Sequence, residues 1–298
     1  MPDIAHELHR LKRRIRRITS SGSPFRYLYK WQDYLVRPAS HLRRRKEAQA
    51  LTKKLTPEFA AHVQRLRTTG FSPAEAELDQ ALLQELSEFA AARTAPGTLE
   101  LNREQVRSFF NRLNNEKDLA STGIMVRFAL QPNVVAIASA YLGEVPYLSC
   151  VQIIESFHNG KDRWEESQLW HRDHEDSRTV KLWIYLSDVT SPDVGPFTYL
   201  PLPYSDRVKD NFYPGRIDDQ RMASFGVLDE AKAVVGPRLT SFYIDSSRCY
   251  HLGSRVAPGH SRIIYEATFV TQAPLFRLDS GIQVEEPVSP LHALVLRR

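Results

Sequence analysis

The chain has 298 residues, of which 42% are hydrophobic and 25% are charged, and its net charge is +5. These values are typical of a soluble globular protein and exclude a disordered or fibrous chain. Two cysteines, Cys150 and Cys249, are too few for a disulfide framework, and no run of about 18 apolar residues predicts a membrane-spanning helix. We therefore expect a cytoplasmic protein.

The positive charge is concentrated near the N-terminus. Residues 1–60 contain 15 Lys and Arg against 5 Asp and Glu, a net charge of +10, so the remaining residues carry a net charge of −5. Within residues 3–18, Ile and Leu recur every three or four positions opposite a cationic face, which predicts an amphipathic helix. We predict a basic helical arm over residues 1–55, followed by one domain over residues 56–298.

Three roles are open for this arm. The first is a solvated cationic helix, the second a helix that lies on the inner membrane surface, and the third a segment that contacts the phosphates of a nucleic acid. No recognised nucleic-acid module accompanies it, so nucleic acid is the disfavoured partner. The membrane surface is the preferred functional role, and the sequence makes no prediction of the oligomeric state.

Helical patterns follow the arm. Thr56 is a typical N-cap for a helix that runs to Arg67 and is ended by Gly70. The later helices are predicted at three places: Pro73–Ala92, near Arg103–Asn115, and Asn133–Leu142, with Gly143 as its stop.

From about residue 146 the pattern changes to short strands rich in β-branched and aromatic residues. The predicted strands are Tyr147–Phe157, Val180–Leu186, Phe197–Leu200, Leu239–Ile244 and Arg262–Val270. Turn-forming residues separate them, which is typical of a β-sandwich or barrel with a core over about residues 146–272. The stretch Tyr204–Val235 reads as a strand-free excursion over this core.

The segment Gln168–Asp176 (QLWHRDHED) lies directly before one of these strands. His171 and Asp173 are two residues apart, which places both side chains on one face of an extended strand. His251 comes much later in the chain, beside another predicted strand. Two histidines and one carboxylate occupy one face of a metal ion and leave three positions open, which suits Fe(II) that must also bind a cosubstrate and O2.

Arg262 follows His251, on the next predicted strand. A guanidinium there can hold one end of a dicarboxylate through two charge-assisted hydrogen bonds. A metal triad with such an arginine is what a 2-oxoglutarate-dependent oxygenase needs. Arg255 is the alternative, but it lies closer to a turn than to a strand.

Four nearby residues compete as metal ligands. His174 faces away from His171 and Asp173 if strand alternation holds, and Cys249 is interpreted as a small buried residue. Glu175 and Asp176 are expected in a mobile loop over the metal.

At these positions the chain resembles a known family. WHRD, VKLWIYLSDVTSPDVGPFTYLP and YHLGSRVAPGHSR are similar to motifs of the phytanoyl-CoA dioxygenase superfamily, and so are the upstream LRTTGF and AYLG. The resemblance covers roughly residues 56–275. It departs from the family after the Gly-Pro turn, where many members have Pro-Gly-Ser-His and this chain has PLPYS.

The resemblance implies an α+β fold, a double-stranded β-helix (a jelly-roll, cupin-like barrel) with flanking helices and the basic helical extension. It implies that His171, Asp173 and His251 bind Fe(II), that Arg262 binds the distal carboxylate of 2-oxoglutarate, and that Trp183 lines the cosubstrate pocket. The implied reaction consumes O2 and 2-oxoglutarate and hydroxylates an unactivated C–H bond of a small molecule. The arm favours a lipid or a lipid-linked glycan, and a natural product is the other candidate.

Two other functions compete with this hypothesis. A cupin-like metal enzyme that does not use 2-oxoglutarate would not need Arg262. A non-catalytic protein that binds membrane or nucleic acid would not need the complete metal triad.

Overall fold

The structure is a computed structural model that describes residues 25–74, 77–94, 109–161, 163–209, 215–275 and 279–297. The helix predicted over residues 3–18 lies outside this part of the chain. The helices are α2 (Phe25–Val36), α3 (Pro38–Lys53), α4 (Pro57–Thr69), α5 (Gln80–Thr94), α6 (Ile124–Ala129), α7 (Pro132–Leu142), α8 (Leu202–Ser205), α9 (Asp219–Ala223) and α10 (Pro290–Leu296). The strands are β1 (Phe71–Ala74), β2 (Phe110–Arg112), β3 (Tyr147–Phe157), β4 (Val180–Tyr185), β5 (Phe197–Tyr199), β6 (Lys232–Val234), β7 (Ser241–Ile244), β8 (His251–Leu252) and β9 (Ser261–Val270).

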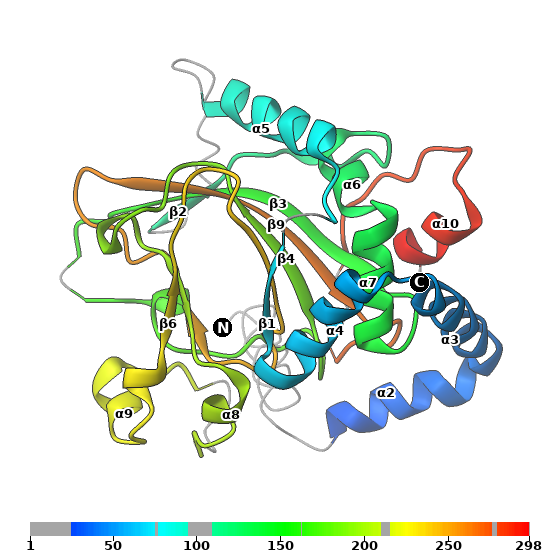
Figure 1. Ribbon diagram of the computed structural model, residues 1–298, viewed down its shortest axis with the longest axis horizontal. Helices are drawn as coiled ribbons and strands as arrows, with labels where there is room; N and C mark the ends of the chain where they lie inside the picture. The colour runs from blue at the N-terminus through cyan, green and yellow to red at the C-terminus, as the bar shows by residue number, and fades with distance from the viewer. Residues whose placement is uncertain are drawn as a thin grey trace, which may run out of the picture.

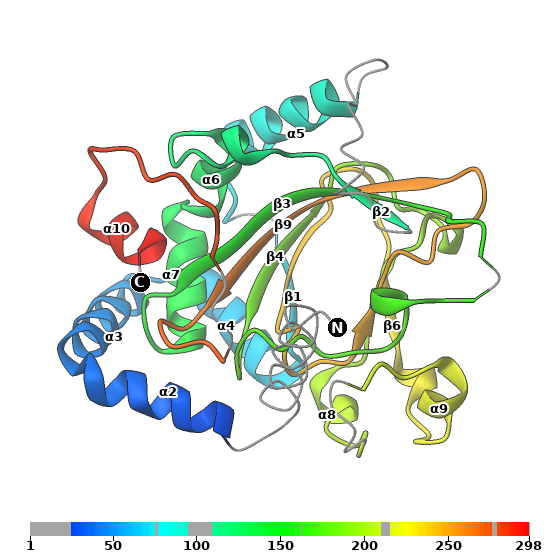
Figure 2. The ribbon, with the colours of Figure 1, turned by 180° about the vertical axis from the view of Figure 1, so that it is seen from behind.

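Two antiparallel sheets form the β core. The larger has the order β1-β7-β4-β9-β3-β2, and the smaller has the order β6-β5-β8. Helices α4 and α7 lie on one side of the larger sheet, and β6 of the smaller sheet lies on the other (Figure 1). The reverse view shows the same layers (Figure 2). The arrangement is a mixed helix and sheet fold, consistent with a jelly roll.

Strand alternation gives the larger sheet two different faces. On β9, Tyr265, Ala267 and Phe269 pack into the hydrophobic core under the helices. The intervening side chains line a cavity inside the β core; they are Arg262, Ile264, Glu266 and Thr268. The same alternation on β3 and β4 means that one sheet face stabilises the fold while the other supplies functional groups.

The two helices next to the sheet are the ones that the sequence marks most clearly. Thr56 caps α4 by accepting a hydrogen bond from the backbone N–H of Phe59, and Gly70 ends the helix with a left-handed φ of 78°. Helix α7 ends at Gly143 in the same way, with a φ of 80°. Both predictions are confirmed, with boundaries one or two residues wider.

Two predicted helices differ from the structure. Pro73 belongs to strand β1, where it pairs with Phe242, and α5 begins only at Gln80. Near Arg103–Asn115 the described part contains strand β2, whose residues pair with β3. In both places pairing with a neighbouring strand overrides the helical pattern of the local sequence.

The excursion Tyr204–Val235 is confirmed in outline, but it is not free of strands. Within its described residues it contains α9 and the short strand β6, which pairs with β5 in the smaller sheet. Two of the three β6 residues are exposed, so the strand lacks the apolar pattern that would have predicted it.

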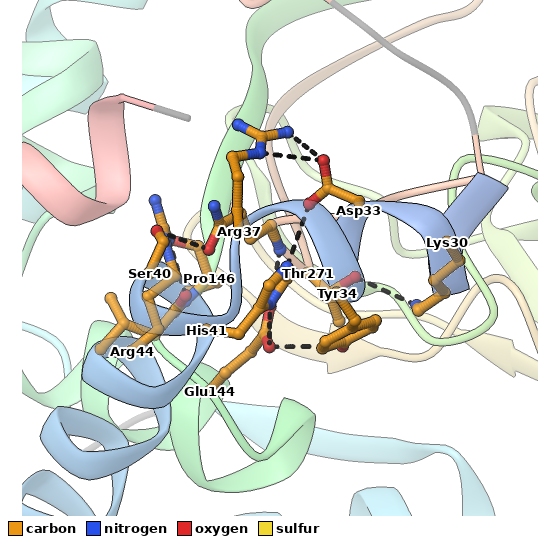
Figure 3. Close-up of polar contacts among 12 residues, drawn as sticks. Lys30, Asp33, Tyr34, Arg37, Ser40, His41, Arg44, Glu144, Pro146 and Thr271 are labelled. Carbon is orange, nitrogen blue, oxygen red and sulfur yellow. Dashed lines mark hydrogen bonds and ion pairs between the residues drawn. The ribbon is translucent and has the colours of Figure 1, made fainter.

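Helices α2 and α3 are tied to the body by a cluster of polar contacts (Figure 3). His41 Nε2 lies 3.0 Å from an oxygen of Asp33, and His41 Nδ1 lies 3.5 Å from Glu144. Lys30 donates to Thr271 Oγ1 at 3.1 Å. Much of the predicted arm is therefore packed, and the boundary at residue 55 stays a prediction. No helix in the described ranges is long and apolar enough to cross a membrane.

Candidate metal centre

The two histidines of the predicted triad face each other across a backbone pair. His171 N donates to His251 O at 2.9 Å, and His251 N donates to His171 O at 2.8 Å. Asp173 is fixed by a hydrogen bond from its own N–H to Ser246 O, at 2.8 Å. Two segments that are distant in the sequence are thereby held together by main-chain bonds, independently of any ion.

Each imidazole is oriented by a carbonyl of its own segment. His171 Nδ1 lies 2.8 Å from Leu169 O, and His251 Nδ1 lies 3.0 Å from Cys249 O. A carbonyl only accepts, so Nδ1 carries the proton in both rings and Nε2 is the nitrogen with a lone pair. Both lone pairs are therefore available on the side where Asp173 lies.

The three side chains meet at one point. Asp173 Oδ1 lies 3.8 Å from His171 Nε2, and Oδ2 lies 3.7 Å from His251 Nε2. One donor atom from each residue falls within 4.8 Å of the other two. Asp173 Oδ2 is buried, and although Lys181 is close to it, no donor in the described part of the chain is aligned to hydrogen-bond with it. This donor set fits a divalent metal ion bound by two imidazoles and one carboxylate.

The protonation states suit a metal. Burial lowers the pKa of His171 to about 3, and the neighbouring His251 acts in the same direction. Burial also lowers the pKa of His251. For Asp173, burial alone would raise the pKa, but Lys181 and the two histidines hold it well below its usual range. Neutral imidazoles and an ionised carboxylate are the forms that bind metal.

Lys181 is a charged residue of the cavity that the sequence reasoning missed. Its Nζ lies 2.8 Å from Asp173 Oδ2, 3.1 Å from Glu266 Oε1 and 3.9 Å from Glu175 Oε1. Burial alone would lower the pKa of Lys181, but the surrounding carboxylates raise it well above its usual value. The available signal was a single charge in the apolar strand VKLWIYL, on the same alternation phase as Trp183.

Arg262 lies at the other end of the inner face of β9 and is fully buried. Its guanidinium donates to Gly195 O and Ser254 Oγ, and its Cζ lies 5.9 Å from the ring centre of Trp183. Arg262 Nε and Trp183 Nε1 are buried, and within the described ranges neither has a hydrogen-bond acceptor. Two buried donors without acceptors, both on residues that line the cavity, fit an anionic group.

The rival arginine is engaged elsewhere. Arg255 forms a two-pronged ion pair with Asp219, at 2.7 and 2.9 Å, and donates from Nε to Gln168 O. It is not among the residues that line the cavity, whereas Arg262 is. The structure therefore favours Arg262 as the arginine next to the metal site.

The other residues considered as metal ligands lie in different places. Cys249 is directed to the end of α4, where its Sγ lies 3.6 Å from Thr69 O. Asp176 is buried beside Lys30, so the expectation of a mobile loop over the metal is wrong for this residue. Glu175 instead lines the cavity, where burial and the nearby Asp173 raise its pKa to about 7.

The residues of the site surround one cavity of about 660 Å³. It is lined by the triad, by Arg262 and Trp183, and by Lys181 with its carboxylates. The five site residues predicted from the sequence therefore share one cavity, although no ligand marks their roles.

Comparison with known proteins gives a likeness of fold. No family model matches the chain, and no curated protein sequence matches it significantly. The structure of EctD from S. alaskensis with 2-oxoglutarate and 5-hydroxyectoine has 17% sequence identity and a TM-score of 0.52, over 82% of this chain and 84% of that chain. EctD with bound Fe has 16% identity and a TM-score of 0.51, over 78% and 82%. The α-ketoglutarate-dependent epimerase SnoN is also similar, at 15% identity over 72% and 83%, but its TM-score of 0.45 supports no argument.

Proposed function

We propose that the protein is an Fe(II)/2-oxoglutarate-dependent dioxygenase on a double-stranded β-helix, as in the phytanoyl-CoA dioxygenase superfamily that the sequence resembles. The proposed reaction is the hydroxylation of an unactivated C–H bond of a small molecule. The observation that carries the proposal is one cavity that joins a His-Asp-His triad to a buried arginine. The fold shared with EctD is consistent with it.

In this proposal His171, Asp173 and His251 hold the iron. Bound Fe(II), with 2-oxoglutarate and O2, supplies the oxidising chemistry that protein side chains lack. The protein keeps both Nε2 lone pairs free through the Nδ1 bonds to Leu169 O and Cys249 O. Three protein ligands on one face leave the opposite positions to cosubstrate and O2.

Arg262 binds the distal carboxylate of 2-oxoglutarate. The orphaned Nε of Arg262 and Nε1 of Trp183 find their acceptors in that carboxylate. Between this end and Lys181, the cavity is lined by Ile154 and Ile264, which pair across β3 and β9. This apolar band excludes water around the chain of the cosubstrate.

The test measures binding before turnover. Calorimetry under argon with Mn(II), and then with 2-oxoglutarate, should show saturable binding of both to the wild type. Asp173→Ala should abolish metal binding. Arg262→Gln should keep the metal but weaken 2-oxoglutarate binding by roughly 10- to 100-fold, because a buried charge-assisted bond contributes about 1.5–3 kcal/mol.

Arg255→Gln is the matched control, because it removes an arginine that does not line the cavity. Its affinity for 2-oxoglutarate should equal that of the wild type. Wild-type affinity in Arg262→Gln would contradict the role of Arg262, whereas a wild type that binds the metal but not 2-oxoglutarate would favour the cupin-like enzyme. With Fe(II) and O2, the wild type should release succinate from 2-oxoglutarate, and wild-type release by His171→Ala would contradict the assignment.

A further inference from the structure

The inner face of the larger sheet changes character along its strands. At one end Ser156 pairs with Arg262, in the middle Ile154 pairs with Ile264, and at the other end Gln152 pairs with Glu266. Arg262 and Glu266 are four residues apart on one strand face, a distance of roughly 13 Å at 3.3 Å per residue. The cavity therefore has a charged end that is separate from the arginine end.

We name this charged end the polar wall; it consists of Gln152, Glu175, Lys181, Glu266 and Thr268, all of which line the cavity. Glu266 is 5% exposed, and its Oε1 accepts from Thr268 Oγ1 at 2.8 Å and contacts Lys181 at 3.1 Å. In the described part of the chain neither contact reaches Oε2. This oxygen is the acceptor that the wall presents to a ligand.

Acidic side chains outnumber the ammonium group in the wall. Lys181 contacts three carboxylates, those of Asp173, Glu175 and Glu266. In the proposed enzyme Asp173 is a metal ligand, so Lys181 is left between the carboxyl groups of Glu175 and Glu266. Arg112 joins the wall only at its exposed edge, through a bond to Gln152 at 2.8 Å. Arg216 also lines the cavity. It directly precedes Ile217, whose backbone pairs with that of Trp170.

We infer that the polar wall binds a hydrophilic substrate that carries hydroxyl groups and a protonated amine, with Glu266 as the acceptor for the amine. This inference rests on the proposed function, because it assigns the substrate end of the same cavity. A hydrocarbon chain there would remove water from buried charges and offer no hydrogen bond in return, which is strongly unfavourable. An amine-bearing polyol or sugar replaces that water with donors and acceptors. The preference for a lipid chain, which came from the basic arm alone, is therefore reversed for the reacting part of the substrate.

The experiment uses the full chain loaded with Fe(II) and 2-oxoglutarate. Three pools of compounds are tested for stimulation of succinate release: aminosugars and amino polyols, the matching neutral sugars and polyols, and fatty acyl thioesters. We expect the amine pool to stimulate release most. Stimulation by the acyl pool alone, or none by the amine pool, overturns the inference.

The Glu266→Gln variant tests the named acceptor. Affinity for the best amine, measured by calorimetry on the Mn(II) and 2-oxoglutarate complex under argon, should fall at least tenfold, while the 2-oxoglutarate affinity should stay within twofold. Glu155→Gln is the matched control, because Glu155 is on neighbouring β3 but does not line the cavity. Equal loss in both variants, or no loss in Glu266→Gln, contradicts the role of Glu266.

If the wild type fails to bind 2-oxoglutarate, the proposed function fails. If it binds 2-oxoglutarate but is not stimulated by amines, only this inference fails.

Discussion

At the scale of single residues, buried charged groups set the protonation states of the metal ligands. Lys181 keeps Asp173 ionised although that carboxylate is buried, and burial keeps the His171 imidazole neutral. Removal of one partner from such a buried set leaves an uncompensated charge, which typically costs about 3–5 kcal/mol. The residues around the metal ligands therefore contribute to the protonation state of the site as well as to its shape.

Asp245, just after β7, provides a test of buried charge away from the ligands. Burial raises its pKa from 3.8 to about 6, although bonds from Tyr141 and the Thr179 N–H oppose the rise. The folded state therefore binds a proton more tightly than the unfolded state. The stabilisation from this group is complete below about pH 4 and is lost as the pH rises through 6.

We expect the free energy of unfolding of the wild type, relative to Asp245→Asn, to fall by about 1 kcal/mol between pH 5 and pH 7. Urea unfolding at both pH values measures this difference. The exposed Asp193→Asn variant is the control and should show almost no change in its difference from the wild type. A difference for Asp245→Asn that rises with pH would contradict the assigned direction.

At the scale of elements, strands rich in β-branched and aromatic residues could be predicted from the sequence. Strand β3 has the predicted bounds, Tyr147–Phe157, because both its faces carry β-branched and aromatic residues. Strand β2 was predicted as a helix because only its pairing with β3 makes it a strand. The triad could be predicted because its residue types and spacing are specific. The role of Lys181 could not, because its partner Glu266 comes from strand β9, which is distant in the sequence.

The end of helix α4 packs against the segment that carries His251. Gly70 has a φ of +78°, and a Cβ added there would lie 2.1 Å from Cys249 Sγ, two residues before His251. Replacement by alanine therefore combines a left-handed backbone penalty of about 1 kcal/mol with a steric clash. A displaced Cys249 would also shift His251, which lies on the same segment.

We expect Gly70→Ala to lower the free energy of unfolding by roughly 2–4 kcal/mol and to weaken Mn(II) binding. Gly143→Ala is a closely matched control, since Gly143 ends α7 with a φ of +80° and an added Cβ would meet nothing within 4 Å. It should cost only about 1 kcal/mol and leave Mn(II) binding unchanged. Equal effects of the two variants in urea unfolding would show that the contact with Cys249 does not matter.

At the scale of the whole molecule, the excess of positive charge lies in residues 1–60, which precede every residue that lines the cavity in the sequence. Arg44, in the basic run Arg43–Lys46, is buried and donates to Val145 O, so it is part of the body and does not belong to a free arm. Residues 1–24 contain six Lys and Arg against two Asp and Glu. They are the part of the predicted arm that lies outside the described residues.

We expect the full chain to float with anionic vesicles, and deletion of residues 1–24 to reduce binding at least tenfold, since each basic residue near an anionic surface contributes about 1 kcal/mol. Neutral vesicles and added salt are the controls, and both should weaken the binding of the full chain. Equal flotation of the two chains on anionic vesicles would remove the membrane hypothesis without affecting the proposed reaction.

The paired backbone of His171 and His251 has a consequence for which ion the protein acquires in a cell. Because main-chain bonds of 2.9 and 2.8 Å set the two imidazoles in place, the ligand face exists before any ion arrives. A rigid face of two imidazoles and one carboxylate binds Zn²⁺ and Cu²⁺ more tightly than Fe²⁺. If the protein is the proposed iron enzyme, its fold offers little protection against other metals, and loading depends on the supply of free iron relative to its competitors when the chain folds.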